Sequence, residues 1–304
     1  DGCTPDDLLK SADIALYVGK AEARGELSMF EQKHRAGLRE RIEMVSVARS
    51  AVKEGRVLPF YQPKCALRDR SIQGFEALLR WHHPTLGVQL PATISAAFED
   101  LDVATLISRT MLELVISDMR DWLDEGLNFG HVAINAGEAE FRRDGFAEAL
   151  LSKLYTSQIP PRYLQLEVTE TVFLGQGADC VERALKMLDQ EGVRIALDDF
   201  GTGYASLRHL KQFPVHVMKI DQGFVQGMGA NAEDVAIISA VVNLGKRLGL
   251  DVIAEGIETE KQEERLRQLG CEFGQGYLYS RAVPASEVPK MLRRATLHPA
   301  AQSV

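Results

Sequence analysis

The residues that decide how this chain folds are Val193-Arg194-Ile195-Ala196-Leu197-Asp198-Asp199-Phe200-Gly201-Thr202-Gly203-Tyr204. The mostly apolar run that ends at Leu197 is typical of a buried strand, and the glycines after it mark the end of that strand. Two adjacent acids at a buried strand end repel each other, and a buried carboxylate is costly unless it is neutralised. The stretch therefore predicts a strand end that faces a cation, although taken alone it is also compatible with a solvated Asp-Asp turn.

Short apolar strands of this kind alternate with longer amphipathic helices from Val57 onward. Eight strands are expected, at Val57–Tyr61, Ile72–Leu78, Val132–Asn135, Leu164–Val168, Arg194–Leu197, Val217–Ile220, Val252–Ala254 and Phe273–Tyr277. Eight strands with helical crossovers over about 240 residues match an α/β fold, the (β/α)8 barrel of TIM type, in number and in length.

The first interval between strands is the exception to this pattern. About ten residues separate Tyr61 from Ile72, whereas a crossover between parallel strands needs a dozen or more. The first two strands are therefore expected to run antiparallel, which predicts a barrel with one reversed strand.

Polar residues lie in or just beyond the expected strands at intervals of about one βα unit. They are Glu76, Asn135, Glu167, Asp198, Asp199, Lys219, Glu255 and Gln275. Singly, each is weak evidence, because a lone acid at a strand end is usually a cap or a surface ion pair and a lone lysine usually lies on the surface. Together they are expected at the C-terminal mouth of the barrel, where such barrels build their active sites.

The donor atoms of this set are oxygens. Five carboxylates and the Asn135 amide suit hard divalent ions such as Mg²⁺ or Mn²⁺, whereas zinc favours histidine or cysteine. Adjacent acids can face two ions, one of them bridging, as two-metal hydrolysis requires. The residues alone thus predict a metal-assisted hydrolase that acts on phosphate.

The composition is that of a soluble globular protein, with 45% apolar and 26% charged residues among 304. The net charge of −8 provides no basic surface for a nucleic-acid polymer. The four cysteines show no paired spacing, which favours reduced thiols and a cytoplasmic location. No membrane span or signal peptide is evident, and the chain opens without Met, so we expect a fragment of a longer protein, possessing no membrane contact of its own.

Seven ordered motifs over residues 45 to 296 resemble the EAL-domain family of cyclic di-GMP phosphodiesterases. They are Tyr61-Gln62-Pro63, Glu76-Ala77-Leu78-Leu79-Arg80-Trp81, Glu167-Val168-Thr169-Glu170, Asp198-Asp199-Phe200-Gly201-Thr202-Gly203, Lys219-Ile220-Asp221, Ala254-Glu255-Gly256-Ile257-Glu258 and Gln275-Gly276-Tyr277. The resemblance implies a barrel with one antiparallel strand and hydrolysis of cyclic di-GMP to linear pGpG with two Mg²⁺ or Mn²⁺ ions. The sequence departs from the family pattern from Thr93 to Asp102, outside the acidic set, which leaves the local helix packing open.

The resemblance also implies a role for each matching residue. One metal would be held by Glu76, Asn135, Glu167 and Asp198, and a second by Asp198, Asp199 and Glu255. Lys219 would hold the attacking water, Glu255 would share in taking its proton, Gln275 would hydrogen-bond near the water, and Gln62 and Arg80 would contact the dinucleotide. Glu170 would anchor the loop after Asp199, which the family uses for metal binding and for a homodimer formed through the barrel.

The first 55 residues read as helical and too small for an independent core. Residues 5 to 31 resemble the C-terminal end of a GGDEF diguanylate cyclase domain, through Leu8-Leu9-Lys10-Ser11-Ala12-Asp13-Ile14-Ala15-Leu16-Tyr17, Lys20-Ala21 and Phe30, without the signature that a cyclase needs. We therefore expect a GGDEF remnant over residues 1–31, a connector helix over 32–55, the EAL barrel over 56–296 and a tail over 297–304.

Two other functions remain open at this point. A cyclic di-GMP receptor that binds without hydrolysis is the main alternative, because a complete set of acids is inactive if its members are misplaced by about 1 Å. A barrel hydrolase for a different phosphodiester is the other.

Overall fold

The computed structural model describes residues 4–22, 29–142, 144–174, 178–201, 210 and 212–297. The chain forms two compact units, one of Asp1–Arg56 with Trp81–Ile107 and the other of Val57–Arg80 with Ser108–Val304. The second unit holds the barrel strands.

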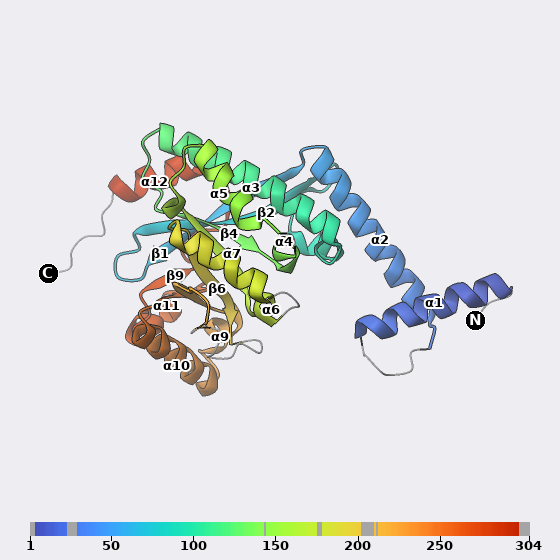
Figure 1. The fold of residues 1–304 in the computed structure, drawn as a ribbon. Coiled ribbons are helices and arrows are strands. Elements are labelled where there is room, and N and C mark those ends of the chain that lie inside the picture. The colour runs from blue at the N-terminus through green and yellow to red at the C-terminus, as the bar shows by residue number, and fades with distance from the viewer. Residues whose placement is uncertain are drawn as a thin grey trace. The chain divides into compact units, whose positions relative to one another are not determined.

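Eight strands form a closed barrel (Figure 1). Their bounds are β1 Val57–Ala66, β2 Ile72–His83, β4 Val132–Ala136, β5 Leu164–Thr169, β6 Arg194–Phe200, β7 Val217–Ile220, β8 Asp251–Ala254 and β9 Phe273–Gln275. Neighbours follow the order β1-β9-β8-β7-β6-β5-β4-β2, and a pairing of β1 with β2 closes the ring. The expected fold class and all eight strands are confirmed.

One strand of the barrel is reversed, as the short first interval predicted. The neighbours from β2 through β4, β5, β6, β7 and β8 to β9 pair in parallel, whereas β1 pairs antiparallel with β9. A tight turn joins β1 to β2, in which the amide of Arg70 donates to the carbonyl of Ala66 at 2.8 Å. Such a turn brings the chain back beside itself and leaves no room for a crossover helix.

The helices of the second unit lie outside the ring of strands (Figure 1). Their bounds are α3 Leu101–Asp124, which belongs to this unit from Ser108 on, α4 Glu138–Phe141, α5 Phe146–Thr156, α6 Glu170–Leu174, α7 Ala178–Gln190, α9 Gln222–Gly227, α10 Ala232–Leu248, α11 Glu260–Gln268 and α12 Val288–Leu297, with short 3₁₀ turns at Pro161–Tyr163 and Ala285–Glu287. In α3, Trp122 packs edge-on against Tyr61 of β1, with ring centroids 4.8 Å apart, so an outer helix is held to the barrel by aromatic contact.

Several strand bounds differ from the sequence-based expectation, and β6 in particular continues past Leu197, through Asp198 and Asp199, to Phe200. The strands β1 and β2 extend to Ala66 and His83, and two short strands, β3 Gly87–Gln89 and β10 Val283–Pro284, were not predicted. Conversely, β9 ends at Gln275 and not at Tyr277, because the chain turns there and the amide of Tyr279 donates back to the carbonyl of Gly276. Runs of two or three residues carry too little periodicity to be recognised as strands.

The first unit contains the helices α1 Pro5–Glu22 and α2 Gln32–Lys53 and the 3₁₀ segment η1 Pro91–Phe98. The segment that departs from the family pattern forms η1, in which Ile94 has a non-helical backbone and is buried. Residues 1–3, 23–28 and 298–304, which belong to the expected remnant and tail, lie outside the described residues. Within the described part of the chain, no helix has the length and apolar character needed to cross a bilayer.

Candidate active site

Seven barrel strands and the loop after an eighth supply the polar residues predicted from sequence. Gln62 lies on β1, Glu76 and Arg80 on β2, Asn135 on β4, Glu167 on β5, Asp198 and Asp199 on β6, Lys219 on β7 and Gln275 on β9, while Glu255 follows β8 directly. All of them belong to the second unit. Because the seven parallel strands end at the same rim, residues toward their C-terminal ends meet at one mouth, where Gln62 joins them from the reversed strand through its contact with Gln275.

Lys219 is the centre of this group and is almost fully buried, with 1% of its side chain exposed. Its ammonium nitrogen Nζ lies 2.6 Å from Glu167 Oε2, 2.6 Å from Glu255 Oε1, 3.0 Å from Asp198 Oδ1 and 3.4 Å from Glu76 Oε2. One cation thus holds carboxylates from four different parts of the barrel. Although burial opposes its charge, the surrounding carboxylates, Glu167 foremost, raise the pKa of Lys219 well above its usual value.

Glu76 is tied to the amide side chains of the site. The Nε2 atom of Gln275 donates to Glu76 Oε2 at 2.7 Å, and the Nδ2 atom of Asn135 donates to Glu76 Oε1 at 3.1 Å. Gln275 Nε2 also donates to Gln62 Oε1 at 3.0 Å, and Gln62 in turn donates to the carbonyl of Ser280. This network fixes both oxygens of Glu76 and connects β1, β2, β4 and β9.

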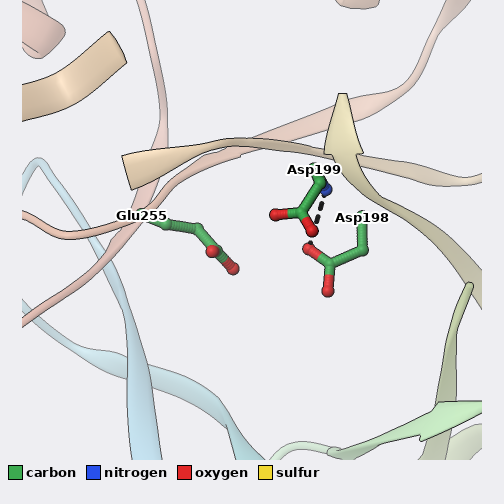
Figure 2. Close-up of side chains that lie close together, drawn as sticks. All are labelled: Asp198, Asp199 and Glu255. Atoms are coloured by element: carbon green, nitrogen blue, oxygen red, sulfur yellow. Dashed lines mark hydrogen bonds between the residues drawn. The ribbon is translucent and has the colours of Figure 1, made fainter. Parts of the chain in front are cut away.

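Asp198, Asp199 and Glu255 form a compact acidic cluster. One oxygen from each lies within 4.8 Å of the other two. Figure 2 shows the two aspartates side by side at the end of β6, with Glu255 opposite them. The pairing of β6 with β7 shifts register between Leu197 and Phe200, and Asp199 has a left-handed backbone with φ of 52°, so the shift sets the direction of its side chain.

Two glycines of the expected motifs, each directly after a site residue, allow neighbouring segments to approach their backbone closely at this rim. Gly256, directly after Glu255, has φ of 67°, and a Cβ there would lie 2.6 Å from Gln222 Cβ. At Gly276, directly after Gln275, a Cβ would lie 2.1 Å from the carbonyl oxygen of Ile257. Larger residues at these positions would displace the neighbouring Glu255 and Gln275.

The site carries a surplus of negative charge. Among the described residues, five carboxylates (Glu76, Glu167, Asp198, Asp199 and Glu255) meet two buried ammonium groups, Lys219 and Lys64, which leaves three negative charges unbalanced. Burial and the neighbouring Asp198 raise the pKa of Asp199 to about 6. Burial, with Asp198 and Glu76, also raises the pKa of Glu255 well above its usual value. In the absence of a further cation, Asp199 and Glu255 therefore take up protons at higher pH than ordinary carboxylates do.

These features fit divalent ions. The donors are carboxylate and amide oxygens, the acidic cluster is compact, and the unbalanced charge is of the sign and size that Mg²⁺ or Mn²⁺ would neutralise. The buried Oε1 atom of Glu255 lies 2.6 Å from the Lys219 ammonium, at the edge of this acidic cluster.

Glu170 and Arg80 lie apart from the contacts around Lys219. Glu170 begins α6 and accepts a hydrogen bond from the amide of Gly201 at 3.3 Å, which connects it to the start of the loop after Asp199. Residues 202–209 and 211 of that loop, to which the predicted dimer contact was assigned, lie outside the described residues. Arg80 donates to the carbonyl of Leu79 and lies over the Phe60 ring, and burial lowers its pKa.

Sequence analysis missed one buried cation. Lys64 on β1 has 1% of its side chain exposed, and its Nζ atom lies 2.5 Å from Glu167 Oε1. The available signal was its position two residues after Gln62, since alternate residues of a strand share a face. A lysine that shares a face with a site residue, in a strand otherwise apolar, is a candidate for the barrel interior.

The fold and the acidic mouth define a class of protein, a barrel with one reversed strand and carboxylates at its mouth. Comparison with known families identifies this class. The family model described as "EAL domain" matches residues 46–282, and the chain belongs to the EAL-domain family. The bifunctional diguanylate cyclase/cyclic di-GMP phosphodiesterase MucR of Pseudomonas aeruginosa is 36% identical over 288 residues, which cover 95% of this chain and 42% of MucR. The cyclic di-GMP phosphodiesterase NbdA of the same organism is 31% identical over 293 residues, which cover 96% of this chain and 37% of NbdA.

Solved structures show the same likeness. The PaMucR phosphodiesterase in its c-di-GMP complex superposes with a TM-score of 0.77 at 36% identity, over 81% of this chain and 99% of that chain. The EAL domain of Mycobacterium smegmatis DcpA gives a TM-score of 0.67 at 30% identity, over 79% of this chain and 97% of that chain. The chain therefore spans less than half of the full-length relatives and nearly all of these solved EAL domains.

Proposed function

We propose that this chain hydrolyses cyclic di-GMP to linear pGpG in bacterial second-messenger signalling, with two divalent ions. The observation that carries the proposal is the group of four carboxylates around Lys219, beside the cluster of Asp198, Asp199 and Glu255. The similarity to MucR, whose solved domain is in complex with cyclic di-GMP, supports the choice of substrate.

The ligand sets of the two ions follow from the resemblance and fit the contacts. Glu76, Asn135, Glu167 and Asp198 would hold one ion, and Asp198, Asp199 and Glu255 would hold the other. When bound, Mg²⁺ or Mn²⁺ supplies positive charge that lowers the pKa of a water and stabilises charge on the phosphoryl oxygens.

The side chains of the chain itself perform the remaining tasks. Lys219 orients the attacking water, and Glu255, 2.6 Å from Lys219, accepts a proton from it. The water oxygen forms a bond to phosphorus, the bond from phosphorus to the 3′ oxygen breaks, and that oxygen takes a proton from solvent and leaves as a hydroxyl.

Four further residues position the substrate and the site. Gln275, held between Glu76 and Gln62, hydrogen-bonds near the water. Gln62 and Arg80 contact the dinucleotide. Glu170 anchors the start of the loop after Asp199 through the amide of Gly201. That loop and the barrel would form a homodimer in the cytoplasm.

The test is incubation of the purified chain with cyclic di-GMP and Mg²⁺ or Mn²⁺, with and without EDTA, followed by chromatography. Metal-dependent formation of pGpG in the wild type, and none in Glu76→Ala, is the expected result. Intact dinucleotide together with binding measured by calorimetry would identify a receptor and overturn the hydrolytic mechanism. Absence of binding would overturn the choice of substrate as well.

A further inference from the structure

The reversed strand β1 directs two polar side chains into the barrel. Gln62 and Lys64 are separated by one residue, so both point to the same face of the strand. Gln62 meets Gln275 of the neighbouring strand β9, and Lys64 lies opposite Gln275 in the β1–β9 ladder. From there Lys64 reaches Glu167 on β5, a strand with which β1 does not pair. Its side chain therefore spans the barrel interior.

Each of the two carboxylate oxygens of Glu167 contacts a lysine. Its Oε1 atom lies 2.5 Å from Lys64 Nζ and accepts a second hydrogen bond from Gln165 Nε2 at 3.3 Å. Its Oε2 atom accepts from Lys219 Nζ at 2.6 Å. None of the Glu167 side chain is exposed. One oxygen is thus occupied inside the barrel, and the other is directed to the carboxylates around Lys219.

We propose that Lys64 is a positioning residue, which holds Glu167 Oε1 so that Oε2 alone is presented to a divalent ion. The inference rests on the proposed function, because it assigns Glu167 to an ion. Partners that orient a metal ligand usually affect metal affinity strongly even though they never touch the metal.

A purely structural role for Lys64 makes a different prediction. A buried lysine that only neutralises a buried glutamate would alter thermal stability when replaced and would leave metal affinity unchanged in the folded protein. A lysine that acted only as a nearby positive charge would weaken ion binding in the wild type, so its removal would tighten binding. The change in metal affinity on replacing Lys64 distinguishes the three roles: binding weakens if Lys64 positions Glu167, stays the same if its role is structural, and tightens if it acts only as a positive charge.

The experiment measures Mn²⁺ binding by calorimetry without substrate, together with thermal melting in EDTA. The variants are Lys64→Met, Lys64→Gln, Glu167→Gln and the two double variants Lys64→Met/Glu167→Gln and Lys64→Gln/Glu167→Gln. Lys153→Met is the control, because Lys153 likewise forms an ion pair with a glutamate, Glu113, at 2.6 Å, but outside the site.

We expect Lys64→Met to weaken Mn²⁺ binding about tenfold or more, and Lys64→Gln, which keeps a hydrogen-bond donor, to weaken it less. In the Glu167→Gln background the Lys64→Met change should alter affinity less than about twofold, because there is no carboxylate left to position. Unchanged or tighter binding in Lys64→Met, or the same loss in both backgrounds, would overturn the inference. If Lys64→Met does not fold, the comparison of Lys64→Gln in both backgrounds decides. A wild type that binds no Mn²⁺ would instead overturn the proposed function.

Discussion

Replacing Lys219 by methionine should remove the one cation shared by four carboxylates. The partner side chains are between 0% and 19% exposed, so water compensates little for the loss. Removing one partner of a buried ion pair typically costs about 3–5 kcal/mol. For a domain of this size, that corresponds to a decrease in melting temperature of roughly 10 °C.

The decrease should depend on pH and on metal. The pKa values of Asp199 and Glu255 are raised, so at pH 6 these groups carry less negative charge than at pH 8. The decrease in EDTA should therefore be smaller at pH 6, because fewer carboxylate charges repel one another. Saturating Mn²⁺ should also reduce it, because the ion replaces part of the lost positive charge.

Thermal melting followed by circular dichroism measures this directly. Lys186→Met is the control, because Lys186 lies 2.6 Å from Glu182 on the surface of α7, and exposed pairs contribute only about 0–1 kcal/mol. If Lys219→Met in EDTA at pH 8 melts within about 2 °C of the wild type, the reasoning from four buried contacts is wrong.

Three further predictions test other parts of the structure. Glu76→Ala should reduce formation of pGpG at least about 100-fold, because Gln275 and Asn135 lose their shared acceptor and the proposed ion loses a ligand; chromatography of the reaction measures it. Tyr61→Phe should lower the free energy of unfolding in urea by about 1–3 kcal/mol, because the carboxylate of the partly buried Asp118 loses a hydrogen bond of 2.5 Å. Burial, with Lys64 and Arg194, lowers the pKa of His131 to about 3. As the pH drops below about 6.5, the unfolded chain therefore binds a proton that the folded protein does not, and the free energy of unfolding should fall. Between pH 7 and pH 5, urea titrations should show that the wild type loses about 2 kcal/mol more than His131→Gln.

Each of these predictions has a contrary result. Turnover of Glu76→Ala near that of the wild type would remove Glu76 from the reaction. A change below about 0.5 kcal/mol for Tyr61→Phe would show that water satisfies Asp118 equally well. Equal pH dependence of wild type and His131→Gln would show that the imidazole takes up a proton as readily in the folded protein as in the unfolded chain.

The barrel could be predicted from sequence because its signals are local and repeated. Each strand is a short apolar run, and the interval from Tyr61 to Ile72 is too short for a crossover, which alone predicts the reversed strand. The site residues could be selected because a polar side chain at the end of an apolar strand recurs with each βα unit.

The remaining features depend on contacts that no local pattern encodes. The ion pair of Lys64 with Glu167 joins residues 103 positions apart, and its partner is defined only by closure of the barrel. The left-handed backbone of Asp199 lies within the register shift between β6 and β7, to which residues distant in sequence contribute. Likewise, β3 and β10 exist because a neighbouring strand edge is available to them and not because of their own few residues.

The reversed strand also has a consequence for the order of folding. Its hairpin partner β2 is adjacent in sequence, whereas the seam with β9 joins Gln62 to Gln275 across 213 positions. Contacts so distant in sequence are slow to form, because the loop entropy must be overcome before they contribute stability. We therefore expect β1 to pair with β9 late in folding, and the ion pair of Lys64 with Glu167 to form at the same stage. A chain that has paired its other strands but not this seam would contain all five acids without Lys64 and Gln62 in place, so Mn²⁺ binding would report completion of the barrel during refolding.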